Sequence, residues 1–170
     1  MPDSVEPSAK TVCVLGLGYV GLPTAAMLAV NGLQVIGVDP RSDVVEAVNG
    51  GDVPIEEVGL KTVLQAAVNS GNLRAQVTPE PADAFIIAVP TPIQQDHRAD
   101  LSYVEKAARS IVPHLRAGNL VVLESTVPPG TTDGMLSKIL RESGLRLSED
   151  LFVAHCPERI LPGHILTELV

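Results

Sequence analysis

The chain has 170 residues, enough for one domain to bury a hydrophobic core without disulfide bonds or a structural metal. Its formal net charge of −8 argues against nucleic acid or an anionic membrane as a partner, because either would require a basic surface. Tryptophan is absent and only two Phe and two Tyr occur, so aliphatic side chains must fill the interior, which suits a parallel sheet buried on both faces.

Residues 1–10, MPDSVEPSAK, form a polar arm that lacks the apolar core of a signal peptide. No later stretch is long and apolar enough to be expected to span a membrane. The two cysteines, Cys13 and Cys156, are too few and too differently placed for a disulfide framework or a zinc site. We therefore expect a cytoplasmic protein without a metal, in which residues 11–170 form one domain.

The most informative segment covers residues 12–39. An apolar run ends in the pattern Gly16-x-Gly18-x-x-Gly21, a helical stretch follows, and a second apolar run ends at Asp39. Strand, glycine-rich turn, helix, strand and acid in this order are typical of a dinucleotide-binding unit. Gly16 allows the tight turn, Gly18 lets a pyrophosphate approach the backbone, and Gly21 lets the helix pack close to the strand. The helix N-terminus then offers free N–H groups to the phosphates.

Asp39 stands where a carboxylate can accept hydrogen bonds from the adenosine ribose, so NAD is expected rather than NADP. Arg41 is a contrary signal, because an arginine near this position can accommodate a 2′-phosphate. The carboxylate of Asp39 would repel that phosphate, and NAD remains the expected cofactor. A purely structural turn would explain the glycines, but not the strand, helix and acid around them.

The rest of the chain alternates between helical and strand-like segments. Helices are expected over 42–48 with a Ser42 cap, over 60–69, from Ser102 to Gly118 with a Ser102–Glu105 capping box, and over 131–142. Apolar runs predict strands over 73–77, 84–89, 120–123 and 151–154. Right-handed crossovers then build an α/β fold with a doubly wound parallel sheet, the Rossmann fold, whose ligands collect at the carboxyl ends of the strands.

Three of the later strands run into polar, proline-rich loops, at residues 89–92, 124–130 and 155–159. Rigid loops of this kind can hold hydroxyl groups such as those of Thr91 and Thr126 against a ribose or a reacting alcohol. Glu158 and Arg159 combine an acid/base candidate with a binder of anions. The simpler interpretations are that the prolines only end the strands and that Glu158 and Arg159 form a surface ion pair.

Four motifs together resemble the UDP-glucose/GDP-mannose dehydrogenase family. They are GLGYVGLP at 16–23, VPTP at 89–92, ESTVPPGTT at 124–132 and CPERILPG at 156–163. They follow one another at compatible spacing and cover nearly the full chain. The UDP-glucose and GDP-mannose branches typically continue the Pro-Glu of the last motif with Phe-Leu and an acid, where this chain has Arg159-Ile160-Leu161. The chain looks like the UDP-N-acetylmannosamine dehydrogenase branch.

This resemblance implies a two-step oxidation of the sugar C6 alcohol to a carboxylate, with two NAD consumed per turnover. The substrate would be UDP-N-acetyl-D-mannosamine, the product UDP-N-acetyl-D-mannosaminuronate for surface polysaccharide, and the full-length enzyme a homodimer or larger. The implied cofactor contacts are Gly16, Gly18, Tyr19, Val20, Gly21, Asp39, Arg41, Thr91 and Thr126. The resemblance also implies catalytic roles for Thr126 and Glu158, and substrate contacts for Glu158, Arg159 and Ile160.

The family's nucleophilic cysteine, in a GGHC-type motif, and its catalytic lysine have no counterpart in these 170 residues. Neither Cys13 nor Cys156 matches that nucleophile. The expectation is an amino-terminal cofactor domain, without the family's central helix and carboxy-terminal substrate domain, that binds NAD but is inactive alone. The alternatives are a non-catalytic NAD-binding module or dehydrogenase remnant, and a Rossmann dehydrogenase of 3-hydroxy acids, which the CPERILPG segment disfavours.

Overall fold

The structure, a computed structural model, describes residues 10–55 and 57–157. In chain order its main elements are β1 (Thr11–Leu15), α1 (Gly21–Val30), β2 (Gln34–Val38), α2 (Ser42–Asn49), α3 (Leu60–Asn69), β3 (Leu73–Gln76), β4 (Ala84–Ile87), α4 (Ser102–Ile111), β5 (Asn119–Leu123), α5 (Ser137–Leu140) and β6 (Leu151–His155). Three short helical segments, η1 (Val112–His114), η2 (Thr132–Leu136) and η3 (Arg141–Ser143), extend α4 and α5.

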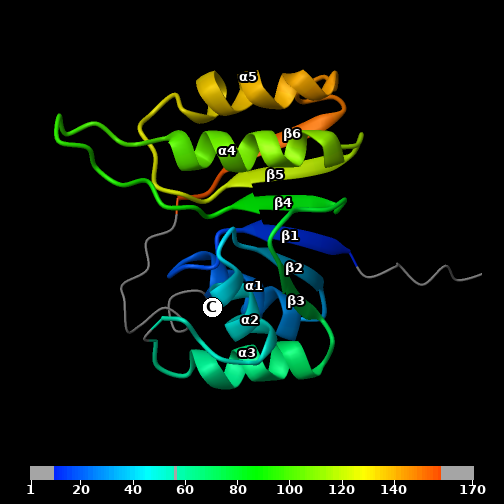
Figure 1. Ribbon diagram of the computed structural model, residues 1–170. Coiled ribbons are helices and arrows are strands. Elements are labelled where there is room, and N and C mark those ends of the chain that lie inside the picture. Colours follow the sequence, from blue (N-terminus) through cyan, green and yellow to red (C-terminus); the bar gives the residue numbers. More distant parts are fainter. Residues whose placement is uncertain (1–9, 56, 158–170) are drawn as a thin grey trace, which may run out of the picture.

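The six strands form one parallel sheet in the order β3-β2-β1-β4-β5-β6. Helices α1, α2 and α3 lie on one side of the sheet, and α4 and α5 lie on the other (Figure 1). The chain therefore leaves β1 in one direction for β2 and β3, and returns beside β1 to add β4, β5 and β6. This confirms the predicted doubly wound sheet. In such sheets ligands bind outside the carboxyl ends of the strands, where the winding direction reverses.

Side chains along β1 alternate between the two helical layers. Cys13 and Leu15 belong to a buried cluster that includes Val104 of α4, whereas Val12 and Val14 belong to a second cluster with the helices of the opposite layer. Successive strand residues point to opposite faces, so a strand that is covered on both sides must be apolar at every position. This explains why the strands of this chain read as unbroken aliphatic runs.

The helix ends differ from the sequence-based expectation at two places. Ser42 is the first residue of α2 and its side chain does not cap the helix, and the predicted capping box of Ser102 and Glu105 is also not formed. At α4 the carboxylate of Asp100 instead accepts the Ser102 N–H at 2.9 Å. Hydrogen bonds from Ser102 hold the pKa of Asp100 below its usual range. Asp competes well for backbone N–H groups near its own position, and here it replaces the serine as the anchor.

Two predicted helices are interrupted. The helix expected to continue to Gly118 ends at Ile111 and becomes the 3-10 segment η1, where Pro113 has no N–H to continue the α-helical pattern. The helix expected over 131–142 is divided into η2, α5 and η3. Within η2 the Leu136 N–H donates to the carbonyl of Thr131 at 3.0 Å, which is the wider π-helical pattern.

Asn119, at the start of β5, joins the segment that leads into β4 to the segment that leads into β5. The side chain is buried, and its Nδ2 donates to the carbonyls of Ala82 at 3.0 Å and Asp83 at 3.2 Å. Its Oδ1 accepts the Arg116 N–H at 2.8 Å. Asn119→Ala removes the partner of the Ala82 carbonyl and of the Arg116 N–H, while the Asp83 carbonyl still accepts the Leu120 N–H. We therefore expect the free energy of unfolding to fall by about 2 kcal/mol in urea denaturation.

Asn31→Ala is the matched control. The Asn31 side chain is exposed and donates once, to the Met27 carbonyl at 2.8 Å, where water can replace it. We expect a loss below about 0.5 kcal/mol in the same assay. Equal losses in the two variants would contradict the structural role assigned to Asn119.

Candidate functional site

The glycine-rich turn after β1 is shaped by close contacts between backbones. Gly16 has a φ of 94°, and its N–H donates to the carbonyl of Val38 at 2.8 Å, which ties the turn to the end of β2. A Cβ atom on Gly16 would meet the carbonyl oxygen of Ala88 at 2.5 Å, and one on Gly21 would meet the Gly16 oxygen at 1.9 Å. Both positions therefore require glycine for the turn, α1 and the end of β4 to come together.

Gly18 is different, because a Cβ atom there would meet no protein atom within 4 Å. It lies beside the N-terminus of α1, whose N-cap residue Val20 makes no side-chain cap and whose first turn holds no acidic residue. The positive end of the helix dipole is therefore not offset from within the helix. Open space beside an uncapped helix N-terminus fits a diphosphate. Tyr19, in the same turn, is half exposed.

Asp39 connects this turn to the start of α2. Its Oδ2 accepts the Leu17 N–H at 3.1 Å, and its Oδ1 accepts the Arg41 N–H at 3.0 Å. Two backbone hydrogen bonds orient the carboxylate at the edge of the sheet, and each oxygen keeps acceptor capacity for a further donor such as a hydroxyl. The sequence predicted that Asp39 could accept a hydrogen bond from a ribose hydroxyl. Its hydrogen bond to the glycine-rich turn was visible only in the structure.

The side chain of Arg41 is held by Asp43, a residue that sequence reasoning did not select. Nε of Arg41 donates to Oδ1 of Asp43 at 3.2 Å, and the guanidinium also contacts the second carboxylate oxygen. The hydrogen bond to Asp43 raises the pKa of Arg41. Arg41, the residue that could have favoured NADP, is thus paired with a carboxylate of the same chain.

The loops after β4 and β5 meet at the carboxyl edge of the sheet. The Thr91 hydroxyl donates to the carbonyl of Thr126 at 2.7 Å, and the hydroxyl of the buried Ser125 donates to the carbonyl of Val89 at 2.8 Å. Two of the three proline-rich loops are therefore joined directly, with Thr126 exposed on their surface. Glu158, Arg159 and Ile160, the other predicted site residues, lie outside the described residues.

Glu124 links the helix of the glycine-rich motif to the end of β5. Its carboxylate is buried, and Oε1 accepts a hydrogen bond from the Thr24 hydroxyl of α1 at 3.3 Å. The sequence marked Glu124 only as part of a motif, because nothing local connects it to Thr24. The contact shows that α1 is positioned both by β1 and by the loop after β5, which carries Glu124 and Thr126.

The two thiols differ strongly in environment. Cys13 is buried in β1, and burial raises its pKa to about 12, whereas Cys156 is exposed. A raised pKa keeps a thiol protonated and unreactive at pH near 8. We expect a disulfide reagent such as Ellman's reagent to modify one thiol rapidly in the folded chain and the second only after denaturation. Cys156→Ser should remove the rapid phase; a rapid phase that survives this change would contradict the assignment.

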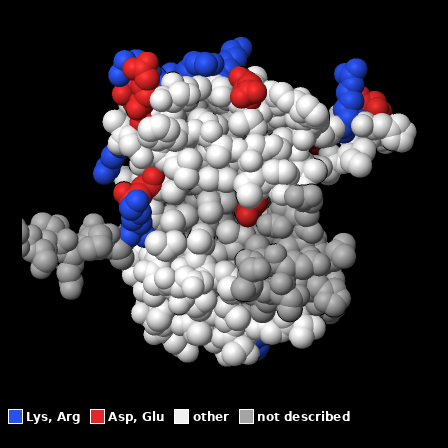
Figure 2. All heavy atoms as spheres, turned by 180° about the vertical axis from the view of Figure 1, so that it is seen from behind, with Lys and Arg blue, Asp and Glu red and all other residues white. Residues whose placement is uncertain are grey.

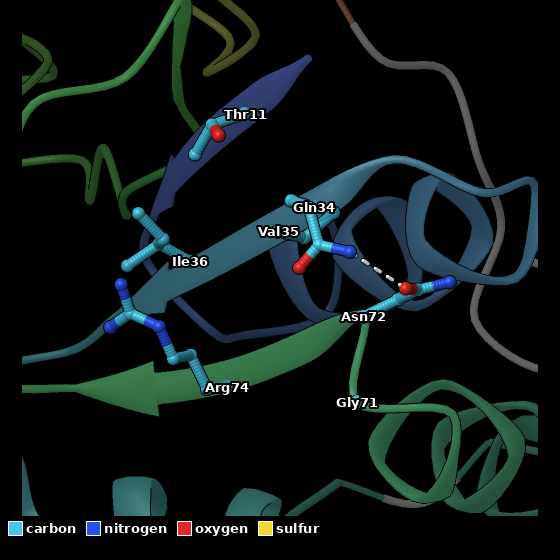
Figure 3. Close-up of a pocket in the computed structure, with 7 residues that line it drawn as sticks. All are labelled: Thr11, Gln34, Val35, Ile36, Gly71, Asn72 and Arg74. Atoms are coloured by element: carbon cyan, nitrogen blue, oxygen red, sulfur yellow. Dashed lines mark hydrogen bonds between the residues drawn. The ribbon is translucent and has the colours of Figure 1, made fainter. Parts of the chain in front are cut away.

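A pocket of about 180 Å³ lies at the opposite edge of the sheet, at the amino ends of β1, β2 and β3 (Figure 3). Thr11, Gln34, Asn72 and Arg74 line it, and Nε2 of Gln34 donates to Oδ1 of Asn72 at 2.8 Å. None of the predicted cofactor residues contributes to this pocket. The carboxyl edge is where the glycine-rich turn, Asp39 and the joined loops converge.

Charged side chains on the face shown in Figure 2 gather mainly at the end formed by α4 and α5, with both signs mixed. On α4, Arg109 contacts Glu105 at 3.1 Å and Glu142 at 2.8 Å. Among residues 10–55 and 57–157, no three or more His, Cys, Asp or Glu side chains are grouped to hold a metal ion. In the same part of the chain, no helix has the length and hydrophobicity needed to cross a membrane.

A doubly wound parallel sheet, a glycine-rich turn before α1 and a carboxylate after β2 together define a Rossmann dinucleotide-binding domain. Comparison with known proteins gives a more specific result. The chain belongs to the UDP-glucose/GDP-mannose dehydrogenase family, whose NAD binding domain matches residues 10–170.

Two named relatives and one solved structure illustrate the similarity. The chain is 49% identical to UDP-N-acetyl-D-mannosamine dehydrogenase of Methanocaldococcus jannaschii, over 95% of this chain and 37% of that protein. It is also 49% identical to NDP-N-acetyl-D-galactosaminuronic acid dehydrogenase of Ralstonia solanacearum, over 100% of this chain and 42% of that protein. The structure of UDP-N-acetyl-mannosamine dehydrogenase from Staphylococcus aureus matches with a TM-score of 0.91 and 44% identity, over 94% of this chain and 39% of that chain.

The chain thus spans 37% and 42% of the length of these two curated relatives. What it shares with them is the NAD-binding domain, and this confirms the predicted family, fold and cofactor.

Proposed function

We propose that this chain is the NAD-binding part of a nucleotide-sugar 6-dehydrogenase that oxidises UDP-N-acetyl-D-mannosamine to UDP-N-acetyl-D-mannosaminuronate. Each turnover would consume two NAD, and the product would serve surface polysaccharide synthesis. The observation that supports this most directly is the 49% identity to the Methanocaldococcus jannaschii UDP-N-acetyl-D-mannosamine dehydrogenase across 95% of the chain. The Arg159-Ile160 sequence after Pro157-Glu158 favours the same branch.

The described residues support positions for the diphosphate and the adenosine ribose of NAD, which would accept the hydride when bound. We assign the diphosphate to the N-terminus of α1, beside Gly18. The space next to Gly18 is open, because a Cβ atom there would meet no protein atom within 4 Å. The adenosine ribose is assigned to the free acceptor capacity of Asp39. Thr91 and Thr126, joined at 2.7 Å, would line the cofactor further along the carboxyl edge.

We assign to Thr126 the additional role of positioning the water that the second oxidation step requires. Glu158 would act near the reacting carbon, with Arg159 and Ile160 as substrate contacts. The nucleophilic cysteine and the catalytic lysine would come from a central helix and a substrate domain beyond these 170 residues, in a homodimer or larger assembly. We also assign such an enzyme to the cytoplasm, because the two cysteines of this chain are too few for a disulfide framework.

A second substrate has comparable support. The Ralstonia solanacearum relative, named for N-acetyl-galactosaminuronic acid, is also 49% identical to this chain. Residues that contact the sugar would distinguish the stereochemistry of the two substrates. The proposed cofactor contacts do not discriminate between these two sugars. The rival from another class is an NAD-binding module without catalysis, which would bind NAD and carry no substrate domain.

The intact mass of the endogenous protein, captured with an antibody against this domain, separates these possibilities. A mass well above 17.9 kDa supports the dehydrogenase, and the captured protein should then form NADH faster with UDP-N-acetylmannosamine than with UDP-N-acetylgalactosamine or UDP-glucose. A mass of 17.9 kDa would favour the NAD-binding module. The isolated chain should bind NAD and form no NADH with any of these sugars; rapid NADH formation would contradict the assignment of catalysis to missing segments.

A further inference from the structure

The start of α2 carries a short arrangement of charges directly beside the proposed ribose position. Asp39 accepts the backbone N–H of Arg41 at 3.0 Å, so Arg41, two residues further along the chain, lies beside the carboxylate that is assigned to the ribose. The Arg41 side chain then turns to Asp43, with Nε to Oδ1 at 3.2 Å and a second contact to Oδ2. The guanidinium thus meets a carboxylate through two nitrogens, the geometry with which arginine also binds phosphate.

Asp43 also lies in the first turn of α2. The hydrogen bond from Arg41 lowers the pKa of Asp43, and the N–H groups of Asp43 and Val44 lower it further. The carboxylate is therefore charged near neutral pH and faces both a guanidinium and a helix N-terminus. These are the two groups that proteins commonly offer to a phosphate.

We propose that Asp43 selects NAD over NADP by holding, with its own carboxylate, the Arg41 guanidinium and the start of α2 that a 2′-phosphate would need. Asp43 can take this role because it lies in the first turn of α2, beside the proposed ribose position. A 2′-phosphate on the ribose assigned to Asp39 would lie near Arg41 and would meet the carboxylates of Asp39 and Asp43 and an arginine already engaged. The inference rests on NAD binding and not on the sugar substrate proposed above.

The alternative is that Asp39 alone excludes NADP, by charge repulsion. Asp39 has other partners, however, because its two oxygens hold the Leu17 and Arg41 N–H groups. Asp43 makes its contacts with the one cationic side chain that sequence analysis marked as suited to a 2′-phosphate. Removing the charge of Asp43 should therefore release Arg41 without disturbing the glycine-rich turn.

The test is titration calorimetry of the purified chain with NAD and with NADP, in the absence of any sugar. In Asp43→Asn we expect the Kd for NADP to fall about fivefold relative to that for NAD, since an exposed ion pair limits the size of the effect. In Asp43→Asn with Arg41→Ala the gain should disappear, because the guanidinium that would bind the phosphate is gone. Thermal unfolding checks that each variant is folded.

Asp52→Asn is the matched control for net charge. Asp52 pairs with Nζ of Lys61 at 2.8 Å, and its side chain is 68% exposed, the same fraction as that of Asp43. The control loses one negative charge without releasing Arg41. The ratio of its Kd for NADP to its Kd for NAD should therefore stay near that of the unchanged chain. The proposal is overturned if Asp52→Asn and Asp43→Asn shift the ratio equally, or if the gain persists after Arg41 is removed.

Discussion

Gly21→Ala is expected to abolish NAD binding and to destabilise the chain by about 3 kcal/mol. A Cβ atom at this position would lie 1.9 Å from the carbonyl oxygen of Gly16, which belongs to the backbone and cannot turn aside. Relief requires α1 to move away from the turn, and this separates the helix N-terminus from the place assigned to the diphosphate. Urea denaturation measures the loss of stability, and calorimetry with NAD measures the loss of affinity.

Gly18→Ala separates cofactor binding from folding. No protein atom lies within 4 Å of a Cβ atom at Gly18, so the free energy of unfolding should stay within about 0.5 kcal/mol of that of the unchanged chain. The methyl group would instead occupy the space assigned to the diphosphate, and NAD affinity should fall more than about tenfold. Gly134→Ala, also without a neighbour within 4 Å, should leave NAD affinity unchanged and, because Gly134 lies in the helical segment η2, raise the free energy of unfolding by up to about 1 kcal/mol.

These variants make the diphosphate assignment testable in one experiment. If Gly18→Ala binds NAD as tightly as the unchanged chain, the diphosphate does not lie on this turn. If Gly21→Ala unfolds at the same urea concentration as the unchanged chain, the close approach of α1 to Gly16 is not required for the fold.

Asp39→Asn is expected to weaken NAD binding by about ten- to a hundredfold, because hydrogen bonds to a charged group are each worth about 1.5–3 kcal/mol. The amide keeps one acceptor oxygen for the N–H groups of Leu17 and Arg41, and its NH₂ group cannot accept the other. The variant therefore loses one of two hydrogen bonds: the one from the Leu17 N–H, which joins the glycine-rich turn to the end of β2 beside the Gly16 N–H to Val38 carbonyl bond, or the one from the Arg41 N–H at the start of α2. Calorimetry with NAD gives the affinity, and thermal unfolding gives the stability.

Asp83→Asn provides the control for that change. Oδ2 of Asp83 accepts the N–H of Thr11 at 2.8 Å, so this carboxylate also holds a backbone N–H of the β1 region, but at the amino end of the strand. We expect a small loss of stability and unchanged NAD affinity. A comparable loss of affinity in both variants would mean that overall charge, and not the position of Asp39, governs cofactor binding.

The first β1-α1-β2 unit could be predicted well from sequence because its signals are local. Gly16 and Gly21 mark the turn, apolar runs mark the strands, and Asp39 follows the second strand directly. Helix ends were harder to predict. The expected caps by Ser42 and Ser102 are not formed, and Asp100 takes over at α4, because several nearby side chains compete for the same N–H groups.

The sequence by itself determined the alternation of strands and helices, the glycine-rich turn, the acid after β2 and the family. Each of these depends on spacing along the chain. Only the tertiary structure decided which distant groups meet: Asp39 with Leu17, Thr91 with Thr126, and Glu124 with Thr24. These contacts join segments brought together by strand order and helix packing. The physical reason is that hydrogen bonds between distant segments depend on atomic positions set by the whole fold, whereas periodicity and turn chemistry depend on neighbours in the sequence.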